Sequence, residues 1–148
     1  MGDRFQEEKT AGIWETDEEK GLSLAALKKK YIAFARFRFI HKPPLAVRNK
    51  DTNWLIEISN RVINEWWGKS RTRERILAIQ LLDLMIEEAK IQETVEDSKK
   101  TPGIENVSYF RNYCKINGKL FKINITVKKI LGLDRRFIYY YSAAGVET

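Results

Sequence analysis

The clearest hydrophobic pattern in the chain lies in the stretch YFRNYCKINGKLFKINITVKK, residues 109–129. Apolar and polar residues alternate on both sides of Asn117-Gly118, a pair that favours a two-residue type I′ turn because both positions tolerate positive φ. The pattern therefore predicts a β-hairpin. Antiparallel pairing around this turn places seven side chains on a core face: Phe110, Cys114, Ile116, Phe121, Ile123, Ile125 and Val127.

The opposite face of the predicted hairpin is basic and aromatic. The same pairing places Arg111 opposite Asn124 and Tyr113 opposite Lys122, close enough to act on one ligand group. Cations that hold phosphates beside rings that stack on bases are typical of single-stranded RNA recognition. A solvated antiparallel face with the same residue types is the alternative interpretation. The whole face comprises Tyr109, Arg111, Tyr113, Lys115, Lys122, Asn124, Thr126 and Lys128.

Further periodic patterns predict helices and strands around the hairpin. Residues 24–37 form an amphipathic helix with Ser23 as its N-cap. Residues 53–58 alternate as a short strand and are followed by a short helix over residues 60–67, and residues 72–92 form the longest helix. Residues 93–103 are expected to form a loop, and residues 134–142 the last strand. Together they predict an α+β fold, with helices packed on one face of a small antiparallel sheet.

Charge is distributed in blocks along the chain. Residues 1–20 hold seven acids and three bases, whereas residues 28–50 hold eight bases and no acid. We therefore expect an acidic, mobile or loosely docked tail over residues 1–22 and a basic helical extension over residues 23–50. The α+β domain then covers residues 51–148.

Net charge and hydropathy limit the classes of binding partner and the cellular compartment that we expect. The formal net charge of +7 favours a polyanion such as RNA, or an acidic host protein, as partner. No apolar run approaches the roughly 20 residues of a membrane span, and the first twenty residues lack the basic and apolar regions of a signal peptide. The single cysteine, Cys114, falls on the core face, which fits a reducing compartment. We expect a cytoplasmic protein with no membrane partner, and the sequence leaves its oligomeric state open.

Motifs of the common cofactor-dependent enzyme classes are missing. The chain has no glycine-rich phosphate loop, no Cys/His metal spacing and no Gly-x-Ser-x-Gly elbow, so we expect no cofactor and no metal. The one histidine, His41, has an ordinary pKa of about 6.5 that suits proton transfer, although a lone loop histidine without a role is the alternative. The candidate catalytic residues are Arg111, Lys122 and His41. The lysine run Lys28, Lys29 and Lys30 is either a solvated helix face or a nucleic-acid contact.

Residues 54–142 resemble a known family. A LIEIS strand followed by a short helix, a helix ending LLDLMIEEAK, the hairpin sequence IENVSYFRNYCKINGKLFKINITVKK and a tyrosine-rich last strand resemble the phage-encoded large polyvalent protein-associated domains. These domains belong with the barnase, EndoU, colicin and RelE-like nuclease domains of phages and mobile elements. The most specific part of the resemblance runs from Phe110 to Lys128, and residues 1–50 lie outside it.

The resemblance implies a metal-independent ribonuclease-type fold whose open sheet face is the active surface. No histidine or carboxylate lies within residues 109–129 of the hairpin, so the resemblance leaves catalysis open. We expect a phage or mobile-element ribonuclease-like domain, a toxin or effector, that binds RNA and, if catalytic, cleaves it without metal. The alternative is a non-catalytic counter-defence inhibitor that binds a host protein or nucleic-acid site. The implied binding face comprises Arg111, Lys122, Asn124 and Thr126, with Tyr109, Tyr113 and Tyr140 as stacking candidates and Lys128 beside them.

Overall fold

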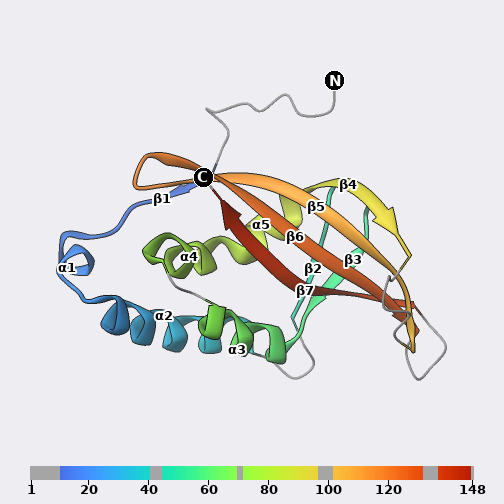
Figure 1. The fold of residues 1–148 in the computed structure, drawn as a ribbon, viewed down its shortest axis with the longest axis horizontal. Coiled ribbons are helices and arrows are strands. Elements are labelled where there is room, and N and C mark those ends of the chain that lie inside the picture. Colours follow the sequence, from blue (N-terminus) through green and yellow to red (C-terminus); the bar gives the residue numbers. More distant parts are fainter. Residues whose placement is uncertain (1–10, 41–44, 70–71, 97–101, 132–136, 148) are drawn as a thin grey trace.

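A computed structural model of the chain describes residues 11–40, 45–69, 72–96, 102–131 and 137–147. These residues form the predicted α+β fold (Figure 1). The helices are α1 (Asp17–Lys20), α2 (Leu24–Phe39), α3 (Asn60–Lys69), α4 (Arg73–Ala78), a 3₁₀ turn η2 (Ile79–Leu81) and α5 (Leu82–Glu88). The strands are β1 (Gly12–Ile13), β2 (Ala46–Arg48), β3 (Leu55–Ile58), β4 (Lys90–Val95), β5 (Ile104–Ile116), β6 (Lys119–Leu131) and β7 (Phe137–Glu147).

The strands of the described residues form one seven-stranded sheet in the order β1-β5-β6-β7-β3-β2, with β4 also paired to β5. Strands β4, β5, β6 and β7 pair antiparallel, but β1 pairs with β5 and β3 pairs with β7 in parallel. The sheet is therefore mixed: the hairpin and the last strand pair antiparallel as predicted, and β1 and β3 add parallel pairs to them. Alternation along a strand indicates which face is buried, but it does not indicate the direction of the neighbouring strand. Long connections such as the one from β3 to β7 permit parallel pairing.

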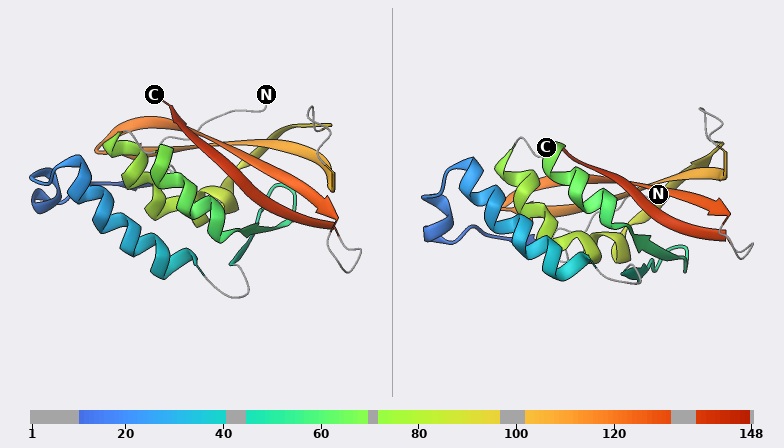
Figure 2. Two further views of the ribbon diagram at one scale, coloured as in Figure 1. Left: turned by 60° about the horizontal axis from the view of Figure 1, so that its bottom comes forward. Right: turned by 90° about the horizontal axis from the view of Figure 1, so that it is seen from below.

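The helices cover one face of the sheet, as expected (Figure 2). All seven side chains on the predicted core face of the hairpin are 5% exposed or less. They pack in one cluster with side chains from the helices, such as Leu27, Phe39 and Ile76. Burial raises the pKa of Cys114 to about 11, which fits a structural thiol. Among the described residues, no helix has the length and apolar character needed to span a membrane.

Helix α2 begins where its cap predicts and belongs to the same core. The Ser23 hydroxyl accepts a hydrogen bond from the Ala26 backbone N–H at 3.1 Å. The buried stripe of α2 contains Leu27, Tyr31, Ala35 and Phe39, which pack with the helices and the sheet. The predicted domain boundary after residue 50 stays a prediction, but residues on both sides of it share one hydrophobic core.

The helix predicted over residues 72–92 is shorter and divided. Its apolar residues Ile76, Ile79, Leu82, Ile86 and Ala89 are buried. The last of its helical segments, α5, ends at Glu88, and residues 90–95 form strand β4 instead of the end of a helix and a loop. The buried Asn49 side chain donates hydrogen bonds to the backbone carbonyls of Ile86 and Ala89, at 2.7 and 2.9 Å. These carbonyls lie at the end of α5, where a helix leaves its last acceptors unpaired. A residue 37 positions away in the sequence therefore stabilises the end of the helix.

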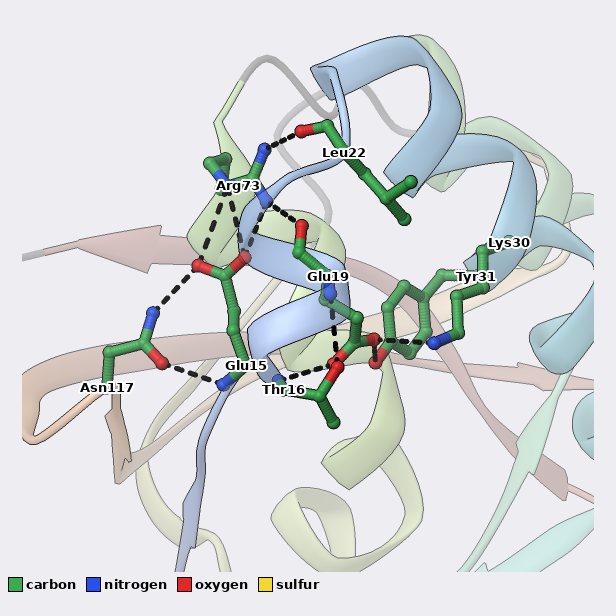
Figure 3. Close-up of polar contacts among 8 residues, drawn as sticks. All are labelled: Glu15, Thr16, Glu19, Leu22, Lys30, Tyr31, Arg73 and Asn117. Atoms are coloured by element: carbon green, nitrogen blue, oxygen red, sulfur yellow. Dashed lines mark hydrogen bonds and ion pairs between the residues drawn. The ribbon is translucent and has the colours of Figure 1, made fainter.

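The N-terminal segment, residues 11–22, docks against the hairpin turn and the helices, while residues 1–10 lie outside the described residues. The Glu15 backbone N–H donates to Asn117 Oδ1 at 2.8 Å, and Asn117 Nδ2 donates to a Glu15 carboxylate oxygen at 2.9 Å. Arg73 Nε donates to the other oxygen of this carboxylate at 3.2 Å. The hydrogen bond from Arg73 lowers the pKa of Glu15. The segment thus connects the hairpin turn to helix α4 (Figure 3).

A second buried carboxylate, Glu19, ties the same segment to α2 (Figure 3). Its side chain is 4% exposed and lies 3.0 Å from Lys30 Nζ. It also accepts hydrogen bonds from the Thr16 backbone N–H, at 2.9 Å, and from the Tyr31 hydroxyl. Burial opposes ionisation of this carboxylate, but the hydrogen bonds outweigh burial and lower the pKa of Glu19 to about 2.

We expect Gly118→Ala to destabilise the fold more than Gly103→Ala. Both glycines have positive φ, 80° and 86°, so both substitutions share a backbone cost of roughly 1–2 kcal/mol. A Cβ at Gly118 would lie 2.9 Å from the Trp14 ring, whereas a Cβ at Gly103 would meet no described heavy atom within 4 Å. Chemical denaturation measures the two losses in unfolding free energy. Equal losses, or a difference that persists in a Trp14→Ala background, would contradict this packing of Trp14 on the turn.

We expect Glu19→Gln to destabilise the protein at neutral pH and to reduce its acid sensitivity. The folded pKa of about 2 lies below the ordinary value of 4.5, so ionised Glu19 stabilises the fold above pH 4.5. This contribution is lost as the pH falls from 4.5 towards 2. Urea denaturation across this range should show a steeper loss for the wild type than for the variant. The exposed carboxylate of α1, changed in Glu18→Gln, is the matched control and should leave the pH profile unchanged.

Candidate nucleic-acid interface

The face of the sheet opposite the helices carries the predicted basic and aromatic residues. The register pairs Arg111 with Asn124 and Tyr113 with Lys122, as the hairpin pattern predicted. No described helix lies on this side of the sheet (Figures 1 and 2). We define the open face as the following residues of three strands: Lys90 and Glu93 of β4, Tyr109, Arg111, Tyr113 and Lys115 of β5, and Lys122, Asn124, Thr126 and Lys128 of β6.

Cross-strand pairing arranges the open face in rows. One row contains Glu93, Tyr109 and Thr126, and the next contains Lys90, Arg111 and Asn124. A third row pairs Tyr113 with Lys122. Directly opposite side chains have Cβ atoms about 4.5–5.5 Å apart, and rows on the same face follow at two-residue steps of about 6.6 Å along a strand. Cations, tyrosine rings and amide or hydroxyl groups therefore lie close enough together for one extended ligand to contact all three kinds of group.

Exposure along the open face varies with side-chain type. The Tyr109 ring is 40% exposed, which is high for an aromatic side chain in the middle of a sheet. The side chains of Arg111, Tyr113, Lys122 and Asn124 are half-buried. Long cationic side chains commonly pack their stems along the sheet and keep the charged end in water. The face thus combines a partly exposed ring with cations held close to the sheet surface.

Strand β4 brings two charged residues that the sequence analysis missed. Lys90 pairs with Arg111 and Glu93 pairs with Tyr109, so both residues join the open face. The prediction placed Lys90 at the end of a helix and Glu93 in a loop. A local signal was present in KIQETV, where β-branched residues are frequent, but this stretch lacks strict alternation because β4 contains an irregularity between Ile91 and Glu93.

Several predicted site residues lie elsewhere or outside the described part of the chain. Lys28, Lys29 and Lys30 belong to α2, on the helix side of the sheet, so the fold does not bring them to the open face (Figure 2). Lys30 is also paired with Glu19. His41 lies outside the described residues. The register pairs the backbone of Tyr140 with Lys128, while the position of the Tyr140 side chain lies outside what the structure describes.

The described part of the chain offers no ready metal centre. Its residues contain no group of three or more histidine, cysteine, aspartate or glutamate side chains placed to hold a metal ion.

Comparisons with known proteins identify the family of the chain. The model of large polyvalent protein-associated domain 3 matches residues 23–139. Neither a curated protein nor a solved structure is similar enough to count as a match. The matched region begins well before residue 54, so it includes α2, which the resemblance seen in the sequence left outside. Because the match covers most of the chain, from α2 to the first residues of β7, the protein belongs to the large polyvalent protein-associated domain 3 family.

Proposed function

We propose that the open face binds single-stranded RNA and that the protein is a ribonuclease-like domain of a phage or mobile element. The observation that carries this proposal is the register of β5 and β6. It places Arg111 and Lys122 in neighbouring rows with Tyr109 and Tyr113, on a face that no described helix covers.

The chemistry of the face suits a strand whose bases are unstacked. Arg111 and Lys122 supply positive charge for phosphates, and tyrosine rings supply surfaces on which bases stack without strong sequence preference. Asn124 and Thr126 offer donors and acceptors to base edges and to the ribose 2′-hydroxyl, the group that distinguishes RNA from DNA. A merely solvated face needs no exposed ring beside its cations, and Tyr109 is 40% exposed.

The net charge also supports a polyanion as the partner. It is formally +7, so the whole molecule attracts phosphates from a distance. Membership in the large polyvalent protein-associated domain 3 family agrees with the resemblance of residues 54–142 to the phage large polyvalent protein-associated domains. An inhibitor that occupies a host protein is the competing proposal, and the binding experiment below separates the two.

We expect the double substitution Arg111→Ala, Lys122→Ala to weaken binding of a labelled single-stranded RNA oligonucleotide. Log affinity should fall linearly with log salt for the wild type, and the double variant should have a shallower slope, by roughly 1 for each phosphate that the variant no longer neutralises. Fluorescence anisotropy at several salt concentrations measures both quantities. Chemical denaturation of the variant shows whether it is folded under the binding conditions, because both side chains are half-buried and Arg111 Nε is buried.

The control is Lys20→Ala, which removes an exposed cation from α1 on the helix side. It should leave the affinity nearly unchanged. A double variant that binds RNA as tightly as the wild type, or wild-type protein with no salt-dependent RNA binding, would refute the proposal and leave the inhibitor hypothesis standing.

We expect Tyr109→Ala to weaken RNA binding by about 1–3 kcal/mol, because stacking of a base on an aromatic ring contributes this much per base. Tyr109→Phe keeps the ring and should bind like the wild type. The same anisotropy titration provides the measurement. Equal affinities for Tyr109→Ala and Tyr109→Phe would show that this ring does not stack on a base.

A further inference from the structure

Strand β4 supplies the open face with a carboxylate, Glu93. We propose that Glu93 is the general base of an RNA cleavage reaction on this face. The inference rests on the proposed RNA binding and adds a reaction and a residue to it. Three features of the molecule carry it: the register of β4, two β-bulges and the neighbouring cations.

A β-bulge directs Glu93 to the open face. Lys90 pairs with Arg111 and Ile91 with Phe110, and the register then shifts so that Glu93 pairs with Tyr109. Gln92 is the extra residue. If Gln92 were paired regularly with Tyr109, Glu93 would pair with Ser108, which is 1% exposed and lies on the helix side of the sheet. The irregularity therefore moves a carboxylate from the helix side of the sheet to the face on which no described helix lies.

A second bulge adjoins the same row from the other side. Between β6 and β7 the register shifts after Thr126, which pairs with Ala143, while Val127 pairs with Tyr141. Thr126 also pairs with Tyr109, and Tyr109 with Glu93. Both bulges thus lie at the row of Glu93, Tyr109 and Thr126. Bulges are over-represented next to active sites, where they redirect side chains, so two at one row indicate a functional centre.

The neighbouring positions complete a reaction site. Lys90, Arg111 and Asn124 form the adjacent row, and diagonal neighbours on one sheet face lie about 7–8 Å apart. One phosphodiester can therefore bridge Glu93 and the cations.

The reaction follows from these groups. The Glu93 carboxylate takes the proton of a ribose 2′-hydroxyl as the 2′-oxygen attacks the adjacent phosphorus. The new bond joins phosphorus to the 2′-oxygen, the bond between phosphorus and the 5′-oxygen breaks, and the leaving oxygen takes a proton from solvent. Glu93 then returns its proton to solvent, so the products are a 2′,3′-cyclic phosphate and a 5′-hydroxyl. Arg111 and Lys90 stabilise the negative charge that develops on the phosphoryl oxygens.

The test compares Glu93→Gln with the wild type on an end-labelled RNA, with EDTA present, under single-turnover conditions. The matched control is Glu96→Gln, which changes an exposed carboxylate just beyond the end of β4. We expect Glu93→Gln to cleave about 10²–10⁴-fold more slowly, the usual contribution of a general base. RNA affinity should stay the same or increase, because the variant loses a negative charge near the phosphates. Glu96→Gln should cleave and bind like the wild type.

Two additional measurements identify the role of Glu93. Glu93→Asp keeps a carboxylate and should retain part of the cleavage that Glu93→Gln loses. The cleaved RNA should carry a 2′,3′-cyclic phosphate, and an oligonucleotide with 2′-O-methyl groups should bind without cleavage. Since Glu93 is exposed, Glu93→Gln should unfold like the wild type.

The outcomes separate the inference from the proposed function. If Glu93→Gln cleaves RNA at the wild-type rate, Glu93 is not the base, while RNA binding by the open face stands. If the wild type binds RNA but does not cleave it, the proposed reaction is refuted and the binding proposal again stands. If the wild type does not bind RNA at all, both fail together.

Discussion

The antiparallel ladder between β5 and β6 is the constraint on which the rest of the structure depends. Its register is set by the Asn117-Gly118 turn, where both residues have positive φ. Because successive side chains of a strand point to opposite faces, a slip of one residue would turn the apolar side chains of one strand away from those of the other. Either Phe110 or Phe121 would then face water, and either Arg111 or Lys122 would face the helices. Exposing these apolar side chains to water would cost free energy. The register that buries the core therefore also determines which polar residues lie on the open face.

The N-terminal segment adds a second restraint at the same turn. Glu15 bonds to Asn117 and to Arg73, so the end of the hairpin is tied to α4. Glu19 is tied in turn to α2 through Tyr31 and Lys30. The acidic residues that the sequence analysis assigned to a tail thus include two buried carboxylates whose hydrogen bonds hold them ionised. The helix side and the hairpin turn are therefore joined by polar contacts as well as by the core.

The two faces of the sheet have different roles in this arrangement. The residues of one face pack in the hydrophobic core, so smaller side chains there would open a cavity. The residues of the open face contribute little to this core, and we propose that they bind RNA and hold a reaction at Glu93. Membership in the large polyvalent protein-associated domain 3 family agrees with a domain built around this hairpin, since the matched residues 23–139 include both of its strands.

The sequence by itself determined the features that depend on neighbouring residues. The turn at Asn117-Gly118, the pairing of Arg111 with Asn124, the Ser23 cap and the buried Cys114 all follow from local conformation and alternation, and all are confirmed. The α+β class followed in the same way from the order of helical and strand patterns.

Only the tertiary structure decided the features that depend on distant partners. The end of α5 at Asn49, the parallel pairing of β1 and β3, and the strand β4 each require contacts between segments far apart in the sequence. The position of Glu93 is the clearest example. One unpaired residue in the ladder with β5 decides whether Glu93 faces the helices or the open side. This ladder forms only in the folded protein, because it joins two strands that are separate in the sequence.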